Sequence, residues 1–222
     1  MGINKTDLDL HVKGHTARAY AAVPDGGGPG VLVLHAWWGL KPFFKQVCDR
    51  LAAEGFTALA PDLLMGHTAG TIAEAEALLH LEQDNVGLLT DIVQAGLGHL
   101  SSLSTGNLGV MGFSMGAYWS MVAAANHPGV KAVVLYYGTS DVDPNKIRAS
   151  VQGHFAEHDP YESPEGVRAM REAMKASGVD ATFYTYAGTS HWFMEDDRPE
   201  YDPGAAVLAW ERTIAFLKKT LG

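Results

Sequence analysis

A serine lies near the middle of the chain with one glycine two residues before it and another two residues after it, in the pentapeptide Gly112-Phe113-Ser114-Met115-Gly116. The pattern G-x-S-x-G is typical of a serine nucleophile held on a sharp turn between a strand and a helix. The glycines leave room for the tight backbone, and the serine hydroxyl attacks a carbonyl carbon once a base accepts its proton. A bare G-x-S-x-G also fits a turn that only lets a helix pack near a strand. The motif therefore predicts a nucleophile only if the flanking elements and a base are present.

Four histidines follow Ser114, and one of them has the position expected of the base. Serine hydrolases with this motif carry the serine, the acid and the histidine in that chain order, each after a strand. His127 precedes a proline at a helix end, and His154 lies inside an expected strand. His158 comes before the last expected strand, whereas His191 follows it. We therefore expect His191 to act as the general base.

The acid that supports the histidine is expected to be Asp159, which directly follows an expected strand in the sequence A-E-H-D-P. A charged carboxylate beside the imidazole fixes its tautomer and stabilises the imidazolium that forms during attack. Glu157 is a rival one residue inside the strand. Asp141 and Asp143 are further rivals, in the stretch T-S-D-V-D-P, which resembles an ordinary turn with capping aspartates. The order of elements favours Asp159.

The tetrahedral intermediate needs two preset N–H donors for its oxyanion. The residue after the nucleophile, Met115, is expected to supply one of them. The other is expected from the loop at 35–39, His-Ala-Trp-Trp-Gly, where we favour the backbone N–H of Trp37. Core packing is the simpler explanation for Trp37 and Trp38. Two adjacent tryptophans at a strand end cannot easily both point inward, so we expect at least one of them to line the pocket.

The elements that must position these residues follow from the periodicity of apolar side chains. Short apolar runs predict strands at 8–12, 17–23, 31–35, 56–60, 108–113, 130–138, 151–157 and 181–187. Helical patterns cover 42–55, 71–100 with a break near Gly87 or Gly96, 115–127, 164–177 and 204–221. This alternation predicts an α/β fold: a mostly parallel sheet of about eight strands that begins antiparallel, with helices on both faces. Without a repeat or linker, residues 1–222 are expected to form a single domain with no lid domain.

Composition excludes several classes of protein. The net charge of -9 argues against a nucleic-acid partner, which usually needs a basic face. The single cysteine, Cys48, lies in a helical pattern and is expected to be a core residue, and one cysteine fits a reducing compartment. No secretory leader or membrane-spanning run is apparent, so we expect a cytoplasmic protein without a membrane partner. The ten histidines lack H-E-x-x-H and the glycine-rich stretches lack nucleotide-binding spacing, so we expect no metal and no cofactor.

Taken together, these residues resemble the dienelactone hydrolase family over nearly the whole chain. The resemblance rests on the motifs HAWWG, PDLL, GFSMG, VLYYG, AEHDP and SHWFMEDDRPEYDPGAAVLAWERTIAFL. It implies the α/β-hydrolase fold and a triad of Ser114, Asp159 and His191. It also implies that the backbones of Trp37 and Met115 supply the oxyanion donors.

Two features of the family's best-known members are absent. Those members use a cysteine nucleophile, with a glutamate in the loop after the third strand that helps to control the ionisation of the thiol. This chain has Ser114 as the nucleophile and Ala36 at the matching place in the loop. The two differences agree physically, because a hydroxyl attacks while its proton passes to histidine and needs no device that holds a thiolate.

The family also grips a substrate carboxylate with arginines, and this anchor is incomplete in the chain. No Lys or Arg occurs from Leu51 to Val130, so the anchor before the nucleophile is missing. Arg198 could supply a cation after the histidine. It could equally pair with Asp196, Asp197 or Glu200, which is the interpretation we favour.

The expected pocket is mostly apolar, with Trp38, Tyr161, Trp192 and Arg198 as candidate substrate-binding residues. A small, uncharged carboxylic ester or lactone, cleaved through an acyl-enzyme on Ser114, is therefore the expected substrate of a monomer or homodimer. Thioesterase, peptidase and perhydrolase chemistry on the same triad remain alternatives. A non-catalytic binding module that keeps the fold is a further one.

Overall fold

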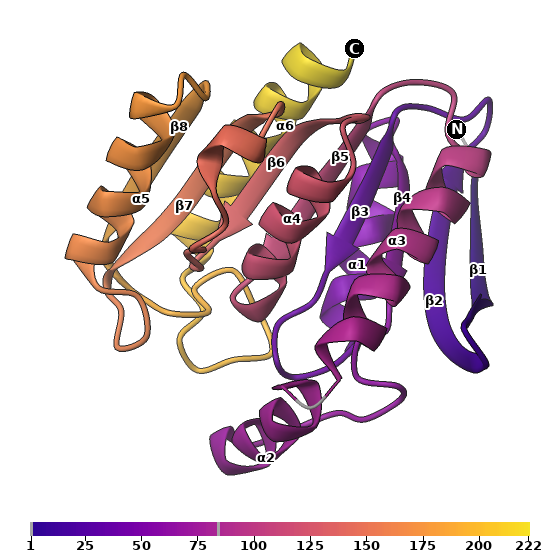
Figure 1. Cartoon of the computed structure of the whole chain (residues 1–222), viewed down its shortest axis with the longest axis horizontal. Coiled ribbons are helices and arrows are strands. Elements are labelled where there is room, and N and C mark those ends of the chain that lie inside the picture. Colours follow the sequence, from indigo (N-terminus) through magenta and orange to yellow (C-terminus); the bar gives the residue numbers. More distant parts are fainter. Residues whose placement is uncertain (1, 84) are drawn as a thin grey trace. The chain divides into compact units, whose positions relative to one another are not determined.

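The computed structural model describes residues 2–83 and 85–222, which form two compact halves (Figure 1). The first half ends at Leu108 and the second begins at Gly109. The residues singled out as nucleophile, acid and base all belong to the second half, whereas Trp37 and Trp38 belong to the first.

The first half is built on four strands, β1 (Ile3–Val12), β2 (His15–Pro24), β3 (Gly30–Leu34) and β4 (Thr57–Pro61). Their order is β1-β2-β4-β3. The β1–β2 and β2–β4 pairs are antiparallel and the β3–β4 pair is parallel, which matches the expected antiparallel start. Every residue of β3 and β4 is buried, as continuous apolar runs of this kind require in a sheet covered on both faces.

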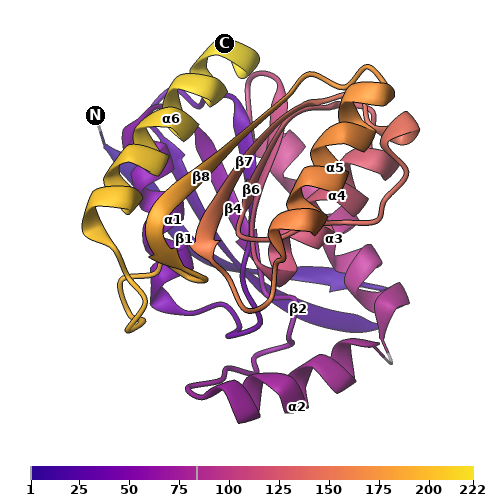
Figure 2. The same cartoon turned by 90° about the vertical axis from the view of Figure 1, so that its left-hand side faces the viewer.

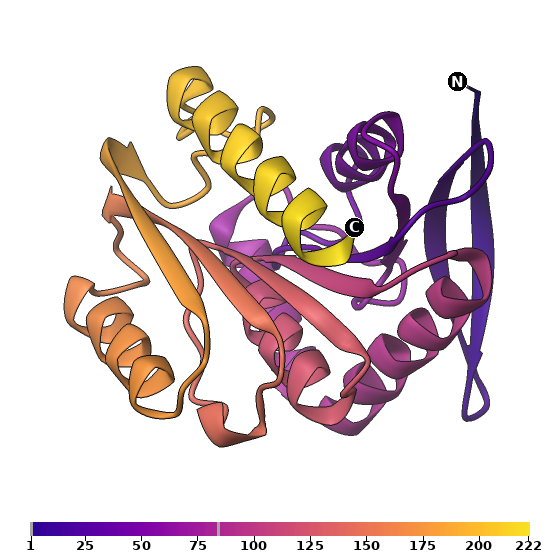
Figure 3. The ribbon, with the colours of Figure 1, turned by 90° about the horizontal axis from the view of Figure 1, so that it is seen from above.

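Three helices belong to this half, α1 (Pro42–Ala53), α2 (Ile72–Gln83) and α3 (Val86–Leu103). Figure 3 shows α1 and α3 on opposite faces of the first-half strands, and Figure 2 shows α2 standing away from those strands. The Cys48 side chain of α1 is fully buried, so its assignment to the core is confirmed.

The helical stretch expected over 71–100 is divided into α2 and α3 just before Gly87, which is one of the two positions where a break was expected. Asp84, at the division, lies outside the described residues. The other position, Gly96, is wrong as a helix break and lies well inside α3. A Cβ at Gly96 would lie 3.1 Å from the Leu32 side chain, so this glycine serves the close approach of α3 to the sheet.

The second half contains all but the first residue of β5 (Leu108–Phe113), followed in space by β6 (Val130–Tyr136), β7 (Ser150–His158) and β8 (Ala181–Ser190). The β6–β7 and β7–β8 pairs are parallel. The helices are α4 (Met115–Asn126), α5 (Pro164–Ala176), α6 (Pro203–Leu221) and the 3₁₀ turn η1 (Pro144–Lys146). In Figure 3, α4 and α5 lie on one face of these strands and α6 on the other.

The expected fold class is confirmed, with eight mostly parallel strands and six α-helices in the described residues. Single-domain organisation stays a prediction. No helix in the described residues is long and apolar enough to cross a membrane. β1 begins at Ile3, five residues before its expected start, and β8 continues to Ser190 rather than ending at Ala187. That extension places His191 directly after a strand.

Candidate active site

The turn that carries Ser114 has a strained backbone. Ser114 is the N-cap of α4 with φ 50° and ψ -113°, and positive φ is uncommon for residues other than glycine. A Cβ at Gly112 would lie 2.0 Å from the Gly116 carbonyl oxygen, so the first motif glycine is required by close backbone contact. A Cβ at Gly138, after β6, would lie 2.6 Å from the Ser114 carbonyl oxygen. Two glycines outside the helix therefore make room for the turn.

Hydrogen bonds join Ser114, His191 and Asp159 in a chain. Ser114 Oγ lies 2.8 Å from His191 Nε2, and His191 Nδ1 lies 2.7 Å from Asp159 Oδ2. The side chains of His191 and Asp159 are each 2% exposed, so solvent competes little for the contact between them. A neutral imidazole with its hydrogen on Nδ1 donates to the carboxylate and accepts the serine proton at Nε2. The arrangement can thus move a proton away from the hydroxyl.

An irregularity in the β7–β8 pairing brings the acid and the histidine to the same level. Ala156 pairs with Tyr186, but the next pair joins His158 to Ser190, so β8 contains two extra residues there. Glu157 Oε2 accepts the N–H of Gly188 at 2.8 Å within this irregular stretch, where Gly188 has φ 75°. Irregularities of this kind re-aim side chains next to active sites. Here the irregularity moves the residue after β8 forward to meet the residue after β7.

The second carboxylate oxygen of Asp159 is held by the chain that follows it. Asp159 Oδ1 accepts the N–H groups of Tyr161 at 2.9 Å and Glu162 at 3.0 Å. With His191 on Oδ2, three donors fix the orientation of this carboxylate.

Three aromatic rings surround the imidazole of His191. The ring centroids of Tyr161 and Trp192 lie 4.9 Å from it and that of Tyr137 lies 5.0 Å away. Trp192 and Tyr137 both have positive φ, 66° and 38°, as does Ser114. Three strained residues thus lie on three segments of the site, as is common where backbone geometry serves function.

A buried pair missed at the sequence level supports this aromatic wall. Tyr137 Oη donates to Glu195 Oε1 at 2.8 Å, and both residues are buried. Burial, and then the adjacent Glu195 carboxylate, hold the pKa of Tyr137 well above its usual range, so the phenol keeps its proton. Tyr137 lies in the motif VLYYG, but nothing in the sequence indicates its partner 58 residues later.

The first predicted oxyanion donor, Met115, is the first residue of α4. The first N–H groups of a helix have no partner within it and point toward an anion placed at its N-terminus. The Ser114 side chain makes no capping hydrogen bond to these groups. The second, Trp37, lies in the first half of the chain, where the Trp37 and Trp38 rings meet edge to face at 5.5 Å. Both side chains are buried, and the oxyanion role of Trp37 stays a prediction.

The rival acids have other partners. Asp143 caps η1 by accepting the N–H of Asn145 at 3.0 Å, as its turn-like sequence indicated. Glu157 holds Gly188, and Asp141 is exposed in the loop between β6 and η1. Of the four candidate acids, Asp159 is the one that is hydrogen-bonded to the His191 ring.

The rival histidines lie away from this chain of hydrogen bonds. His158 is exposed and lies 3.4 Å from Glu157, and His127 caps the end of α4. His154 is buried in β7, where Nδ1 contacts Tyr186 Oη at 2.7 Å and Nε2 contacts Gln152 Oε1 at 3.0 Å. Burial, and then the charge of Arg212, lower the pKa of His154 to about 3, so it stays neutral.

The substrate-binding candidates of the second half separate into two groups. Tyr161 is 44% exposed beside His191, so it can contact a ligand, and Trp192 is buried behind it. Arg198 Nε lies 3.8 Å from Glu200 Oε2, and its guanidinium lies 5.3 Å from the Trp192 ring centroid. These contacts support the structural role of Arg198 that we favoured. Within the described residues, no cluster of three or more His, Cys, Asp or Glu side chains could hold a metal ion.

Comparisons with known proteins agree with one another. A family model described as the dienelactone hydrolase family matches residues 17–221. Protein usf of Aquifex pyrophilus is 33% identical over 96% of this chain and 98% of the relative. A relative in Aquifex aeolicus, provisionally named carboxymethylenebutenolidase, is 30% identical with the same coverage. A crystal structure from Klebsiella pneumoniae, provisionally named dienelactone hydrolase, has a TM-score of 0.87 at 24% identity and covers 99% of this chain and 100% of that one.

Proposed function

Since the chain belongs to the dienelactone hydrolase family, a family of carboxylic ester hydrolases, we propose that it cleaves a small, uncharged carboxylic ester or lactone. The reaction proceeds through an acyl-enzyme on Ser114. The observation that carries the proposal is the chain of two hydrogen bonds, 2.8 Å and 2.7 Å long, from Ser114 through His191 to Asp159.

Acylation begins when Ser114 Oγ attacks the carbonyl carbon and its proton passes to His191 Nε2. The Asp159 carboxylate on Nδ1 stabilises the imidazolium that results. The carbonyl oxygen becomes an oxyanion, which accepts hydrogen bonds from the backbone N–H groups of Met115 and Trp37. When the tetrahedral intermediate collapses, His191 gives its proton to the leaving alkoxide and the acyl group remains on Ser114.

Deacylation repeats these steps with water as the nucleophile. His191 Nε2 takes a proton from water as the oxygen attacks the acyl carbon. Collapse of the second intermediate returns that proton to Ser114 Oγ and releases the carboxylic acid. A lactone gives one product, because its alkoxide and its acyl group belong to the same molecule.

The preference for an uncharged substrate follows from the charges around the site. The segment from Leu51 to Val130 contains no Lys or Arg, and Arg198 already contacts Glu200 and the Trp192 ring. The carboxylates of Asp159 and Glu195 lie close to the His191 ring or to its aromatic neighbour Tyr137. A carboxylate group on the substrate, in addition to the ester that is cleaved, would therefore meet more negative than positive charge.

The test is hydrolysis of p-nitrophenyl acetate, butyrate and octanoate by the wild type and by Ser114→Ala. We expect turnover of the short esters, and a loss of roughly a thousandfold or more in kcat for the variant. Equal rates in the two proteins, or no activity in either while both stay folded, would overturn the proposal. Rates on matched thioesters and amides identify the acyl chemistry among the alternatives. A fluorophosphonate, which labels only an activated serine, separates an enzyme from a binding module.

A further inference from the structure

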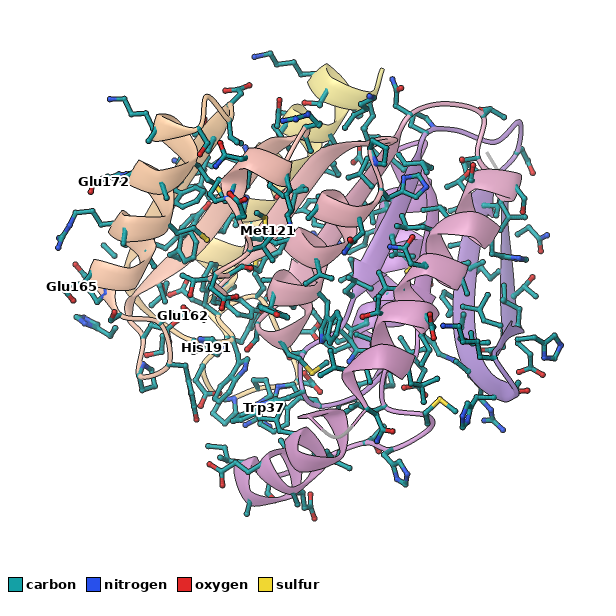
Figure 4. The ribbon with its side chains drawn as sticks, in the orientation of Figure 1. Trp37, Met121, Glu162, Glu165, Glu172 and His191 are labelled. Carbon is teal, nitrogen blue, oxygen red and sulfur yellow. The ribbon has the colours of Figure 1, made fainter. Side chains whose placement is uncertain are left out.

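Glu162 is a second carboxylate beside the imidazole, and sequence reasoning did not select it. Its backbone N–H donates to Asp159 Oδ1 at 3.0 Å, and its side-chain Oε2 accepts the hydroxyl of Thr139 at 2.6 Å. Figure 4 shows the labelled Glu162 and His191 next to one another, below the strands of the second half. The residue is thus attached both to the acid and to a neighbouring loop.

The partner Thr139 connects Glu162 to the turn of the nucleophile. Thr139 directly follows Gly138, whose backbone lies so close to Ser114 that a Cβ would come within 2.6 Å of the Ser114 carbonyl oxygen. The neighbours Gly138 and Thr139 thus connect Ser114 to Glu162. Hydrogen bonds then connect Glu162 to Asp159, Asp159 to His191, and His191 back to Ser114, which makes a closed circuit of contacts. In this circuit, the loop after β6 and the loop after β7 are held by the Thr139–Glu162 hydrogen bond.

The electrostatic surroundings of Glu162 point toward the imidazole. Burial raises the pKa of the Glu162 carboxyl, and hydrogen bonds from Thr139 and then the charge of His191 act in the opposite direction. Asp159 raises it, as a neighbouring negative charge must. The protonated form of His191 is a cation that acts on Glu162, and Arg168 and Arg171 line the same pocket as Glu162. By reciprocity, the Glu162 carboxylate favours the imidazolium.

We propose that Glu162, held by Thr139, is a positioning residue for the hydrolase reaction that stabilises the His191 imidazolium by its charge while its backbone orients Asp159. This inference rests on the proposed function. In the described residues, the groups next to the His191 ring include Ser114, the Asp159 carboxylate, the neutral ring of Trp192 and the phenols of Tyr137 and Tyr161. Glu195 acts one step further out, behind Tyr137.

The key variant is Glu162→Gln, because it keeps an acceptor for Thr139 and removes the charge. We expect the acid limb of the kcat/KM profile to move to lower pH by roughly half a unit or more, since the imidazolium loses a neighbouring anion. At the pH of maximal activity, kcat should fall by roughly threefold to tenfold, with KM for p-nitrophenyl butyrate unchanged. An NMR titration of the His191 ring should shift in the same direction, and this readout does not depend on turnover.

Two further variants separate charge from packing. Thr139→Val removes the hydroxyl that donates to Glu162, so we expect the carboxylate to turn toward water. The acid limb of the kcat/KM profile should then also move to lower pH, by a smaller amount than in Glu162→Gln. Thr139→Ser keeps the hydroxyl and should retain the wild-type profile. The matched control is Glu172→Gln, which removes an exposed charge from α5 and should change neither the profile nor kcat.

The outcomes distinguish this inference from the function on which it rests. If Ser114→Ala keeps full activity, the proposed function is wrong. If Ser114→Ala is inactive but Glu162→Gln and Thr139→Val have wild-type pH profiles and His191 titrations, Glu162 has only a structural role and the inference is wrong. A shift of the same size in Glu172→Gln would also overturn it, because the effect would then come from net charge.

Discussion

His158 and Ser190 are register partners at the ends of β7 and β8, so the next residue on each strand, Asp159 or His191, begins its loop at the same level of the sheet. If the regular pairing of Ala156 with Tyr186 had continued, Asp159 would lie opposite Thr189 instead. The two extra residues of β8 thus determine whether the acid meets the base.

Glu157 should matter because it holds this irregular stretch. Glu157→Ala leaves the Gly188 N–H without its carboxylate acceptor, so the end of β8 that precedes His191 is held less firmly in place. We expect kcat to fall by roughly tenfold with little change in Tm, because the contact is exposed. Steady-state kinetics and thermal melts check this. Glu157→Gln keeps an acceptor oxygen and should behave like the wild type, and full activity in Glu157→Ala would contradict the prediction.

Asp159→Asn tests the choice of acid directly. The amide can donate to His191 Nδ1 and stabilise the tautomer that presents a hydrogen to Ser114, so the imidazole can no longer accept the serine proton. We expect kcat to fall by on the order of 10⁴ with the fold intact. Asp143→Asn, in the cap of η1, is the matched control and should retain activity. Retention of activity by Asp159→Asn, with loss in Glu157→Gln, would transfer the role to Glu157.

Gly138→Ala should destabilise the protein, because the new Cβ would lie 2.6 Å from both the Ser114 carbonyl oxygen and the Ala117 Cβ. We expect a loss of about 2 kcal/mol in the free energy of unfolding, the usual size for overpacking. Urea denaturation measures it. Gly98→Ala in α3 is the control, since nothing lies within 4 Å of its added Cβ and helix propensity should make it neutral or stabilising. Equal stability of the two variants would show that the turn at Ser114 can relax.

His154 should make stability depend on pH in the acid range. The folded-state pKa of His154 is lowered from 6.5 to about 3, so between these values the unfolded chain binds a proton that the native chain does not. Its contribution is fully present above pH 6.5 and is lost as the pH falls toward 3, by roughly 5 kcal/mol at most. Urea denaturation at several pH values should show a shallower decline for His154→Gln. Parallel declines in both proteins would refute the assignment.

Local sequence patterns predicted most of the fold. The apolar runs at 108–113 and 130–138 correspond closely to β5 and β6, because a strand buried on both faces needs a continuous apolar sequence. The chain order of serine, acid and histidine selected three residues that hydrogen bonds join. Their catalytic roles, and that of Trp37, stay predictions.

The supporting contacts could not be predicted, because they depend on register and on packing between distant segments. Nothing local indicates that β8 gains two residues against β7, or that Thr139 meets Glu162 across 23 residues. The Gly96 error has the same origin, since a glycine that interrupts a helix and one that admits a neighbouring strand look alike in sequence. Short-range periodicity carries no information about partners of this kind.

The separation of 77 residues between Ser114 and His191 has a consequence during synthesis of the chain. At roughly 5 to 20 residues per second, the histidine follows the serine by roughly 4 to 15 s, and β8 must then pair before the histidine reaches its place. Under the proposed function, the serine lacks its general base throughout that interval. We therefore expect the hydroxyl to gain its reactivity only after the last strand has joined the sheet.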